Sequence, residues 1–175
     1  MFLRVNENIY LDHLNINLAK DLADIIEKNR SYLKQWLPWL NHSISPSDSE
    51  QFIKKCLKDY EEKTSFTLGV WYEKNLVGLI SFNDINLQKN ETKIGYWLVE
   101  NRMGYGIISA ACKTFIQYGM AVLNLKKFII CCAKQNHKSS AIPLRLGFIK
   151  VAEVKDAEWL YDHYVDHNVF ELLCN

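Results

Sequence analysis

Residues 94–98 read Ile-Gly-Tyr-Trp-Leu, and residues 101–107 read Asn-Arg-Met-Gly-Tyr-Gly-Ile. The first run is the core of a strand expected over residues 93–99, and the second run leads into a long helix. Gly104 and Gly106 therefore lie in a loop directly before a helix N-terminus. Free backbone N–H groups and the positive end of the helix dipole meet there, an arrangement that suits phosphate oxygens. The stretch predicts a strand, a phosphate-binding loop and a helix in succession.

Two common glycine-rich phosphate motifs do not match this loop. No Gly-Lys-Ser or Gly-Lys-Thr follows it, so it is not a Walker loop. Ser109 stands where the dinucleotide-binding motif requires its third glycine. Because Gly-x-Gly alone is often only a turn, the interpretation depends on the surrounding sequence.

Hydrophobic spacing on both sides of the loop indicates a mixed sheet. A helix is expected over 107–123, followed by a buried strand over 127–133, and such a unit places the strands before and after the helix parallel, with a right-handed connection. The fold class is therefore α/β (α+β): a single mixed, mostly antiparallel sheet with flanking helices. Further strands are expected over 9–14, 65–72, 76–83, 148–154 and 167–173, and the second and third of these form a hairpin.

The N-terminal third is expected to be mainly helical. One helix begins near Leu18 and stops near Asn29. Ser47 and Glu50 have the spacing of a capping box that opens a second helix. Trp36 and Trp39 form an aromatic patch between these helices, which could line a peptide groove or act as a lid over the core. The second helix is expected to bury Phe52, Ile53, Cys56, Leu57 and Tyr60.

Composition excludes several classes of protein. The net charge of +1 argues against a dedicated nucleic-acid binder. The longest apolar run, residues 128–133, is too short to span a bilayer, and the polar N-terminus does not have the pattern of a signal peptide. Five cysteines without a Cys-x-x-Cys pair favour a reducing, cytoplasmic location. The histidines have no zinc-binding spacing, so no metal is expected.

A second block, residues 136–148, reads Asn-His-Lys-Ser-Ser-Ala-Ile-Pro-Leu-Arg-Leu-Gly-Phe. Together with the 94–108 block and the spacing between them, it resembles the GNAT acetyltransferase superfamily. Its Arg-Leu-Gly-Phe ending and the Asp-Ala-Glu-Trp stretch at 156–159 resemble the RimJ/RimL branch, whose members acetylate protein N-termini, notably of ribosomal proteins. The resemblance implies the GNAT acyl-CoA N-acyltransferase fold as one domain over 1–175. A helical substrate side would span about 18–64 and an acetyl-CoA-binding core about 76–150.

The resemblance also implies roles for individual residues. The end of the 93–99 strand would pair with the pantetheine arm, and the loop would hold the pyrophosphate through backbone N–H groups. Asn136 would hydrogen-bond the pantetheine, Ser109 could add a hydroxyl, and Ser139 would assist the departing thiolate. The residues implied in acetyl-CoA binding are Trp97, Leu98, Val99, Met103, Gly104, Tyr105, Gly106, Ile107, Ile108, Ser109, Asn136 and Ser139.

The implied activity is transfer of an acetyl group from acetyl-CoA to a primary amine, here a protein N-terminal α-amine, by direct attack in a ternary complex. Two alternatives stay open: an acetyltransferase for a small amine such as a polyamine or an aminoglycoside, and a CoA-binding regulatory module without catalysis. No nucleic acid and no membrane are expected as partners. A homodimer is compatible with the sequence.

Position 93 departs from the branch, because Lys93 stands where relatives commonly carry glutamate. Glu91, two residues earlier on the same strand face, could supply the carboxylate, and Glu100 is a second candidate. Both could equally be solvated surface acids. In the same way, Ser139 could be only a helix cap, and Arg102 could meet a phosphate or solvent.

Overall fold

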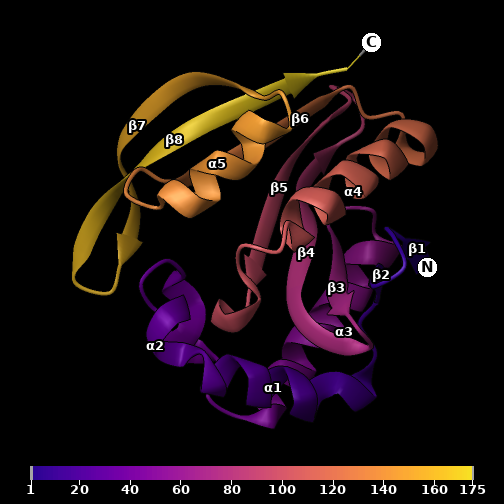
Figure 1. The fold of residues 1–175 in the computed structure, drawn as a ribbon, viewed down its shortest axis with the longest axis vertical. Helices are drawn as coiled ribbons and strands as arrows, with labels where there is room; N and C mark the ends of the chain where they lie inside the picture. The colour runs from indigo at the N-terminus through magenta and orange to yellow at the C-terminus, as the bar shows by residue number, and fades with distance from the viewer. Residues whose placement is uncertain (1, 175) are drawn as a thin grey trace.

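The structure is a computed structural model that describes residues 2–174. Its centre is an eight-stranded sheet in the order β1-β2-β3-β4-β5-β6-β8-β7 (Figure 1). Every neighbouring pair is antiparallel except β5 and β6, which are parallel. The expected mixed, mostly antiparallel sheet is confirmed.

The strands are β1 (Phe2–Arg4), β2 (Ile9–His13), β3 (Phe66–Tyr72), β4 (Asn75–Asn86), β5 (Glu91–Leu98), β6 (Lys127–Ala133), β7 (Ile149–Leu160) and β8 (His163–Leu173). The helices are α1 (Ala19–Lys28), α2 (Arg30–Leu33), α3 (Pro46–Glu61), α4 (Ile107–Leu123) and α5 (His137–Arg145), and the short 3-10 turns are η1 (Ile16–Leu18), η2 (Pro38–His42) and η3 (Glu100–Arg102).

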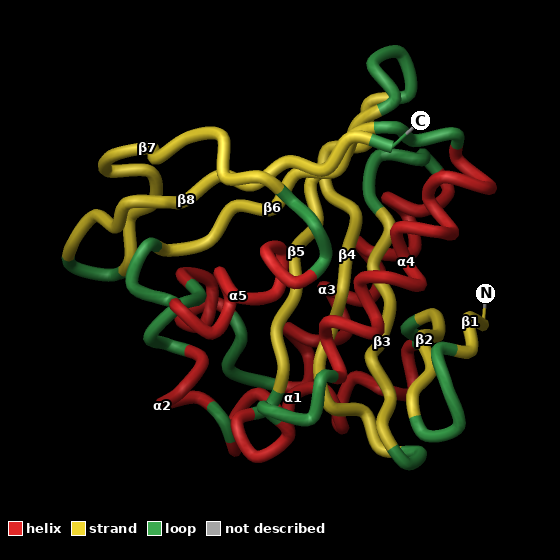
Figure 2. The backbone as a smooth tube through the Cα atoms, turned by 45° about the horizontal axis from the view of Figure 1, so that its top comes forward, coloured by secondary structure: helices red, strands yellow, loops and turns green. Residues whose placement is uncertain are grey.

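The two faces of the sheet carry different helices (Figure 2). On one face, Phe82 of β4 stacks on Phe115 of α4 with ring centroids 3.7 Å apart, and α5 lies on the same side. On the opposite face, α3 packs against β3, and burial raises the pKa of Cys56 of α3 to about 11. We call these the α4 face and the α3 face.

Strands β5 and β6 stay together only at their beginnings. Their pairing covers residues 91–93 of β5 and 127–129 of β6. Beyond these residues β5 continues along β4, while β6 continues along β8 as far as Ala133. The sheet therefore opens between Leu98 and Ala133, and Figure 1 shows the two strands diverging. We call this the open end, and the paired residues 91–93 the closed end.

The capping box of α3 lies two residues earlier than expected. Ser45 Oγ accepts a hydrogen bond from the Asp48 backbone N–H at 3.3 Å, and the Asp48 carboxylate accepts one from the Ser45 N–H at 2.9 Å. Pro46 fits the first helical position because its missing N–H has no helical partner there. The predicted capping box of Ser47 and Glu50 is therefore wrong, because Ser45 and Asp48 form it instead. The Ser45 hydroxyl, which donates to the Asp48 carboxylate at 2.8 Å, and the backbone N–H groups of Ile44 and Ser45 lower the pKa of Asp48.

We expect Ser45→Ala to lower the free energy of unfolding by about 1 kcal/mol, the usual cost of losing an N-cap oxygen. Urea denaturation at neutral pH measures this change. Ser47→Ala is the matched control, because Ser47 is exposed and caps nothing. Equal losses in the two variants would contradict the assignment of the cap.

The buried side of α3 is narrower than the spacing suggested. Ile53 and Cys56 are buried, but Phe52, Leu57 and Tyr60 are 36–40% exposed. Strands β7 and β8 are longer than expected and contain irregular register after Lys150 and Val154. Nearly all of β7 is exposed, because it is the edge strand and pairs on one side only, with β8. Such a strand has no apolar face whose alternation could reveal its length.

No helix among residues 2–174 is both long and apolar enough to cross a membrane.

Candidate active site

The glycine loop presents an open backbone surface at the start of α4. Gly104 and Gly106 have φ angles of +85° and +71°, which L side chains rarely adopt. A Cβ at either position would have no atom within 4 Å, so the space beside the loop is free. Gly106 is also the N-cap of α4 and supplies no side-chain cap. The N–H groups of the first turn, from Ile107 to Ser109, therefore remain available to an anion.

The end of β5 offers a backbone edge at the open end. The Trp97 and Val99 side chains are buried, at 9% and 6% exposure. Only the backbone at these two positions is therefore available to a ligand. Leu98 pairs with Gly78 on β4 and has no partner from β6. A Cβ at Gly78 would collide with the Trp97 carbonyl oxygen and come within 3.0 Å of the Leu98 Cα. Gly78 therefore allows the last residues of β5 to lie where they do.

Asn136 and Ser139 lie at the start of α5. Asn136 is the N-cap, and its Oδ1 accepts a hydrogen bond from the Ser139 N–H at 3.0 Å. The interpretation of Ser139 as the helix cap is therefore wrong, because α5 begins at His137 and Asn136 caps it. The Ser139 hydroxyl lies 3.3 Å from the Tyr96 hydroxyl. Ser139 is thus held beside β5 at the open end.

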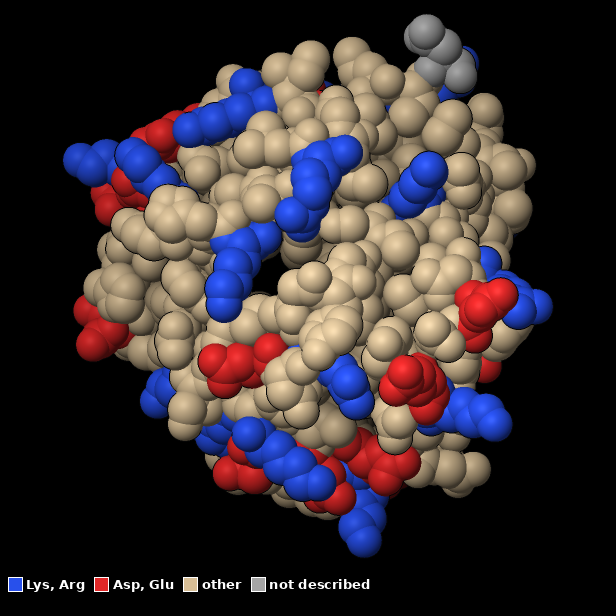
Figure 3. All heavy atoms as spheres, in the orientation of Figure 1, with Lys and Arg blue, Asp and Glu red and all other residues tan. Residues whose placement is uncertain are grey.

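Basic side chains surround the loop. Arg145 Nη2 donates a hydrogen bond to Ser109 Oγ at 3.3 Å, which connects the end of α5 to the first turn of α4. The Arg102 guanidinium lies over the Tyr72 ring, 5.2 Å from its centroid, and the Tyr72 and Tyr105 rings are 6.3 Å apart. Figure 3 shows a hollow near the centre of this face, below α5, with Lys and Arg side chains on two sides. Arg145 was not expected in the site, although it precedes the Leu-Gly-Phe ending of the second block.

Met103 is engaged elsewhere. The Tyr32 hydroxyl of α2 donates a hydrogen bond to the Met103 sulfur at 3.0 Å. The side chain therefore anchors the loop to the N-terminal helices, and the contribution of Met103 to an anion would come from its backbone.

The structure separates the two carboxylates proposed from the sequence. Glu91 lies at the closed end, 4.0 Å from the Lys127 ammonium, which also contacts Glu171 at 2.7 Å. Glu100 lies just past the open end of β5, where its backbone N–H donates to Asn29 Oδ1 and its charge raises the pKa of Tyr32 after the larger effect of burial. Only Glu100 is therefore at the same end of the strand as Ser139.

Lys93 forms an ion pair with Asp84 at 2.9 Å. The hydrogen bond to this carboxylate raises the pKa of Lys93. The side chain stays a cation at neutral pH and has no capacity to act as a base.

A third carboxylate, not expected from the sequence, lies at the open end. Glu158 of β7 contacts His167 of β8, with 3.4 Å between the carboxylate oxygen and Nε2. The Glu158 and His167 side chains are 33% and 17% exposed, so both are half-buried. His167 pairs with Ala133 in the sheet, so its side chain is on the α3 face at the end of β6. The pair combines a carboxylate and an imidazole on the face opposite the glycine loop helix.

The Trp36–Trp39 patch crosses the open end on this α3 face. The Trp39 ring lies 6.4 Å from the Trp97 ring of β5. Trp36 packs against a small buried cluster of Ala133, Leu160 and Val165. The segment therefore reaches from β5 to the turn between β7 and β8, where the Tyr161 hydroxyl donates to the Leu37 carbonyl. Both tryptophans therefore lie beside the opening between β5 and β6, where they could line a groove.

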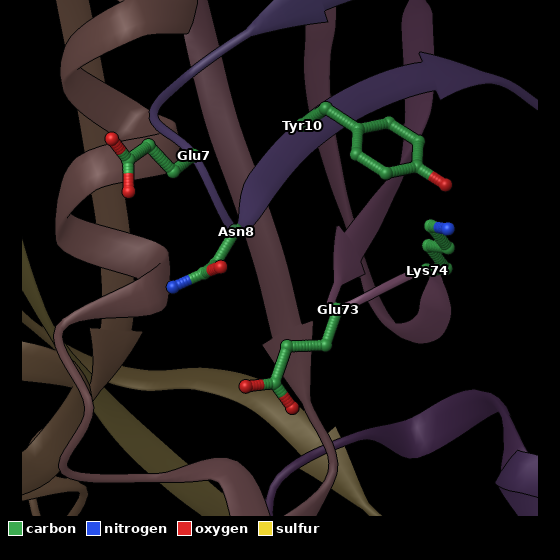
Figure 4. A pocket seen from close by; sticks show the side chains of 5 residues that line it. All are labelled: Glu7, Asn8, Tyr10, Glu73 and Lys74. Atoms are coloured by element: carbon green, nitrogen blue, oxygen red, sulfur yellow. The ribbon is translucent and has the colours of Figure 1, made fainter.

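A separate surface pocket of about 380 Å³ lies at the turns beside β2 and β3 (Figure 4). The lining residues are Glu7, Asn8, Tyr10, Glu73 and Lys74, and none belongs to the two sequence blocks. Two carboxylates against one ammonium make this pocket unfavourable for phosphate. Among residues 2–174, no three His, Cys, Asp or Glu side chains are grouped so that they could hold a metal ion.

Comparisons with known proteins agree with this geometry. The family model for the acetyltransferase (GNAT) domain matches residues 9–149. The ribosomal-protein-serine acetyltransferase of Escherichia coli (strain K12) is 33% identical over 168 residues, which cover 96% of this chain and 94% of that protein. The crystal structure of Microcin C7 self immunity acetyltransferase MccE, in complex with acetyl-CoA and AMP, is 31% identical with a TM-score of 0.92 and covers 97% of this chain and 94% of its own. RimL, the ribosomal L7/L12 alpha-N-protein acetyltransferase, in complex with coenzyme A, has a TM-score of 0.96 at 23% identity, over 99% of this chain and 98% of its own.

Proposed function

Since the chain belongs to the GNAT acetyltransferase family, we propose that it transfers the acetyl group of acetyl-CoA to the α-amine of a protein N-terminus. The chain is an acetyl-CoA-dependent N-acetyltransferase, and the identity of the acceptor is the proposed part. The observation that carries the proposal is the opening of the sheet between Leu98 and Ala133. It has a phosphate-compatible loop on one face and a half-buried carboxylate on the other.

The α4 face would hold acetyl-CoA. Its pyrophosphate fits the free N–H groups at Gly104, Gly106 and the first turn of α4, beside Arg145. The pantetheine arm fits the unpaired edge of β5 near Leu98, as an added strand would. Asn136 lies at the far side of the same opening, at the start of α5.

Ser139 would act on the sulfur of the thioester. A thiol has an unperturbed pKa near 8.5, so a hydrogen bond from the Ser139 hydroxyl is enough to stabilise the departing thiolate. A free backbone N–H near the end of β5 would stabilise the negative charge on the carbonyl oxygen. The acetyl group passes directly to the amine, so no cysteine nucleophile is needed. This assigns Cys132, buried on the α4 face, no covalent role.

The attacking amine must be neutral, so a proton acceptor is required on the α3 face. We assign this role to Glu158, supported by His167, because the pair lies on the α3 face at the open end. Glu100 remains an alternative at the same end. Glu91, at the closed end beside Lys127, would have to act from a distance through water.

We expect Glu158→Gln to lower kcat at neutral pH by roughly 100-fold, the lower range of general base catalysis. Raising the pH should restore part of the rate, because more of the amine is then neutral without help. Glu91→Gln and Glu100→Gln each remove the same charge and should change kcat little. A large loss of kcat confined to one of these two variants would assign the role of base to that residue. An unchanged pH–rate profile in all three variants would show that none of them acts as the base.

A panel of amines tests the proposed acceptor. Release of free CoA is followed with peptides that begin with different residues, with spermidine, with an aminoglycoside and with no acceptor. The proposal expects the highest kcat/KM for a peptide. Preference for spermidine or the aminoglycoside would favour the small-amine alternative, and CoA binding without turnover would favour the regulatory alternative.

MccE gives a reason to include one further ligand, because that 31% identical relative was crystallised with AMP as well as acetyl-CoA. Calorimetry with AMP in the presence of CoA tests whether a nucleotide fits the acceptor side here. A dissociation constant in the micromolar range would point to an acceptor that carries a nucleotide.

The remaining partners are also proposals. We infer a cytoplasmic location from the five free cysteines. No nucleic-acid partner is expected, and a homodimer is compatible with the sequence. Light scattering and a gel-shift measurement check them.

A further inference from the structure

Tyr96 occupies the point where the sheet divides. It is on β5, three residues beyond Lys93, the last residue that pairs with β6. Its register partner on β4 is Ile80, so its side chain is on the α4 face, toward α5. There the Tyr96 hydroxyl donates a hydrogen bond to the Ser139 carbonyl at 3.1 Å, and the Ser139 hydroxyl donates to the Tyr96 oxygen at 3.3 Å. One phenol therefore contacts both the carbonyl and the hydroxyl of Ser139.

The next residue of α5 makes the corresponding contact with the other strand. Ser140 Oγ lies 3.2 Å from Cys132 Sγ of β6, on the same face of the sheet. Two adjacent serines thus connect the first turn of α5 to both diverging strands, one through Tyr96 and one through Cys132. The first turn of α5 bridges the opening, and the position of Ser139 depends on Tyr96.

We propose that Tyr96 is a positioning residue that holds Ser139 at the sulfur of acetyl-CoA and donates a hydrogen bond to Ser139 Oγ when the Ser139 hydroxyl turns toward that sulfur. This inference rests on the proposed function. The exchange moves hydrogen bonds only: Tyr96 and Ser139 both keep their protons, and the electron pair of the broken C–S bond stays on sulfur. Burial raises the pKa of Tyr96, so the phenol remains protonated and able to donate throughout the working pH range.

The test compares Tyr96→Phe, Ser139→Ala and the double variant by kcat, by KM for both substrates and by the calorimetric Kd for CoA. Tyr96→Phe keeps the ring and removes only the hydroxyl, so kcat should fall roughly tenfold while the Kd for CoA changes less than about twofold. Ser139→Ala should lower kcat at least as much. The double variant should match Ser139→Ala, because residues that act as a unit are not additive.

Tyr118→Phe is the matched control. Its ring packs against Phe66 and Phe115, away from α5, so kcat and the Kd for CoA should stay at wild-type values. Chemical denaturation of each variant gives the folded fraction, and kcat is expressed per folded molecule.

Three results would overturn the inference. The first is an unchanged kcat in Tyr96→Phe. The second is a double variant whose loss is the product of the single losses, which would show independent action. The third is a rise in the Kd for CoA as large as the fall in kcat, which would show a structural role only. A wild-type protein that acetylates no amine would instead overturn the proposed function, and the positioning role with it.

Discussion

Gly106→Val is expected to abolish measurable CoA binding. A branched side chain would fill the open space beside the loop and would disfavour the +71° φ angle that directs the backbone N–H groups outward. Each hydrogen bond to a charged phosphate is worth about 1.5–3 kcal/mol, so the loss of two would weaken binding roughly 100-fold or more. Gly104→Val should behave in the same way. Calorimetric titration with CoA measures both.

Gly147→Val is the control for backbone strain. Gly147 has a φ angle of +84° and open space around its Cβ position, but it lies after α5, outside the loop. The strain of about 1–2 kcal/mol from a left-handed residue should lower its stability without changing the Kd for CoA by more than a few-fold. If Gly147→Val and Gly106→Val weakened CoA binding equally, the phosphate assignment would be wrong.

Gly78→Ala is expected to lower both stability and CoA affinity. The new methyl group would collide with the backbone of Trp97 and Leu98, which cannot rotate away as a side chain can. Overpacking of this kind costs about 1–3 kcal/mol, and relief requires the end of β5 to move. Because this end is the proposed pantetheine edge, the Kd for CoA should rise roughly tenfold or more, the effect of one or two misplaced hydrogen bonds.

Gly69→Ala provides the comparison on the neighbouring strand. A Cβ at Gly69 would lie 2.9 Å from Leu76 Cδ1 and from Trp71 Nε1, which are both ends of side chains. These can shift, and β3 is not at the open end. Stability should fall modestly and the Kd for CoA should stay the same. Equal effects on CoA affinity in the two variants would contradict the role of Gly78.

Elements with one buried face could be predicted closely from the sequence. The helix expected over 107–123 and the strand expected over 127–133 are observed with these bounds, because apolar residues recur at the helical period in one and fill a short run in the other. The hairpin of β3 and β4 is also confirmed. Its turn residues Glu73 and Lys74 both have positive φ angles, as a two-residue hairpin turn requires.

Elements without a buried face could not be predicted. β1 has no buried residue and was missed, and β7 was expected to end at 154 although it continues to Leu160. β1 has only three residues and β7 buries only Leu160, so neither strand has a run of buried positions that could reveal a period.

Site residues divide in the same way. Backbone features such as the glycine loop could be predicted from the sequence, because glycine itself indicates an unusual φ angle. The contact between Glu158 and His167 could not be predicted from the sequence, because it joins β7 and β8, whose pairing has an irregular register. The double contact of Tyr96 with Ser139 joins residues 43 positions apart, and only the fold shows their proximity.

The most direct test of the central claim uses one peptide that carries both a free N-terminal α-amine and an internal lysine. The protein is incubated with this peptide and acetyl-CoA at neutral pH, and tandem mass spectrometry locates the acetyl group. We expect acetylation of the α-amine alone, with none when acetyl-CoA is omitted. Acetylation of the lysine side chain, or no acetylated peptide in a sample that acetylates spermidine, would contradict it.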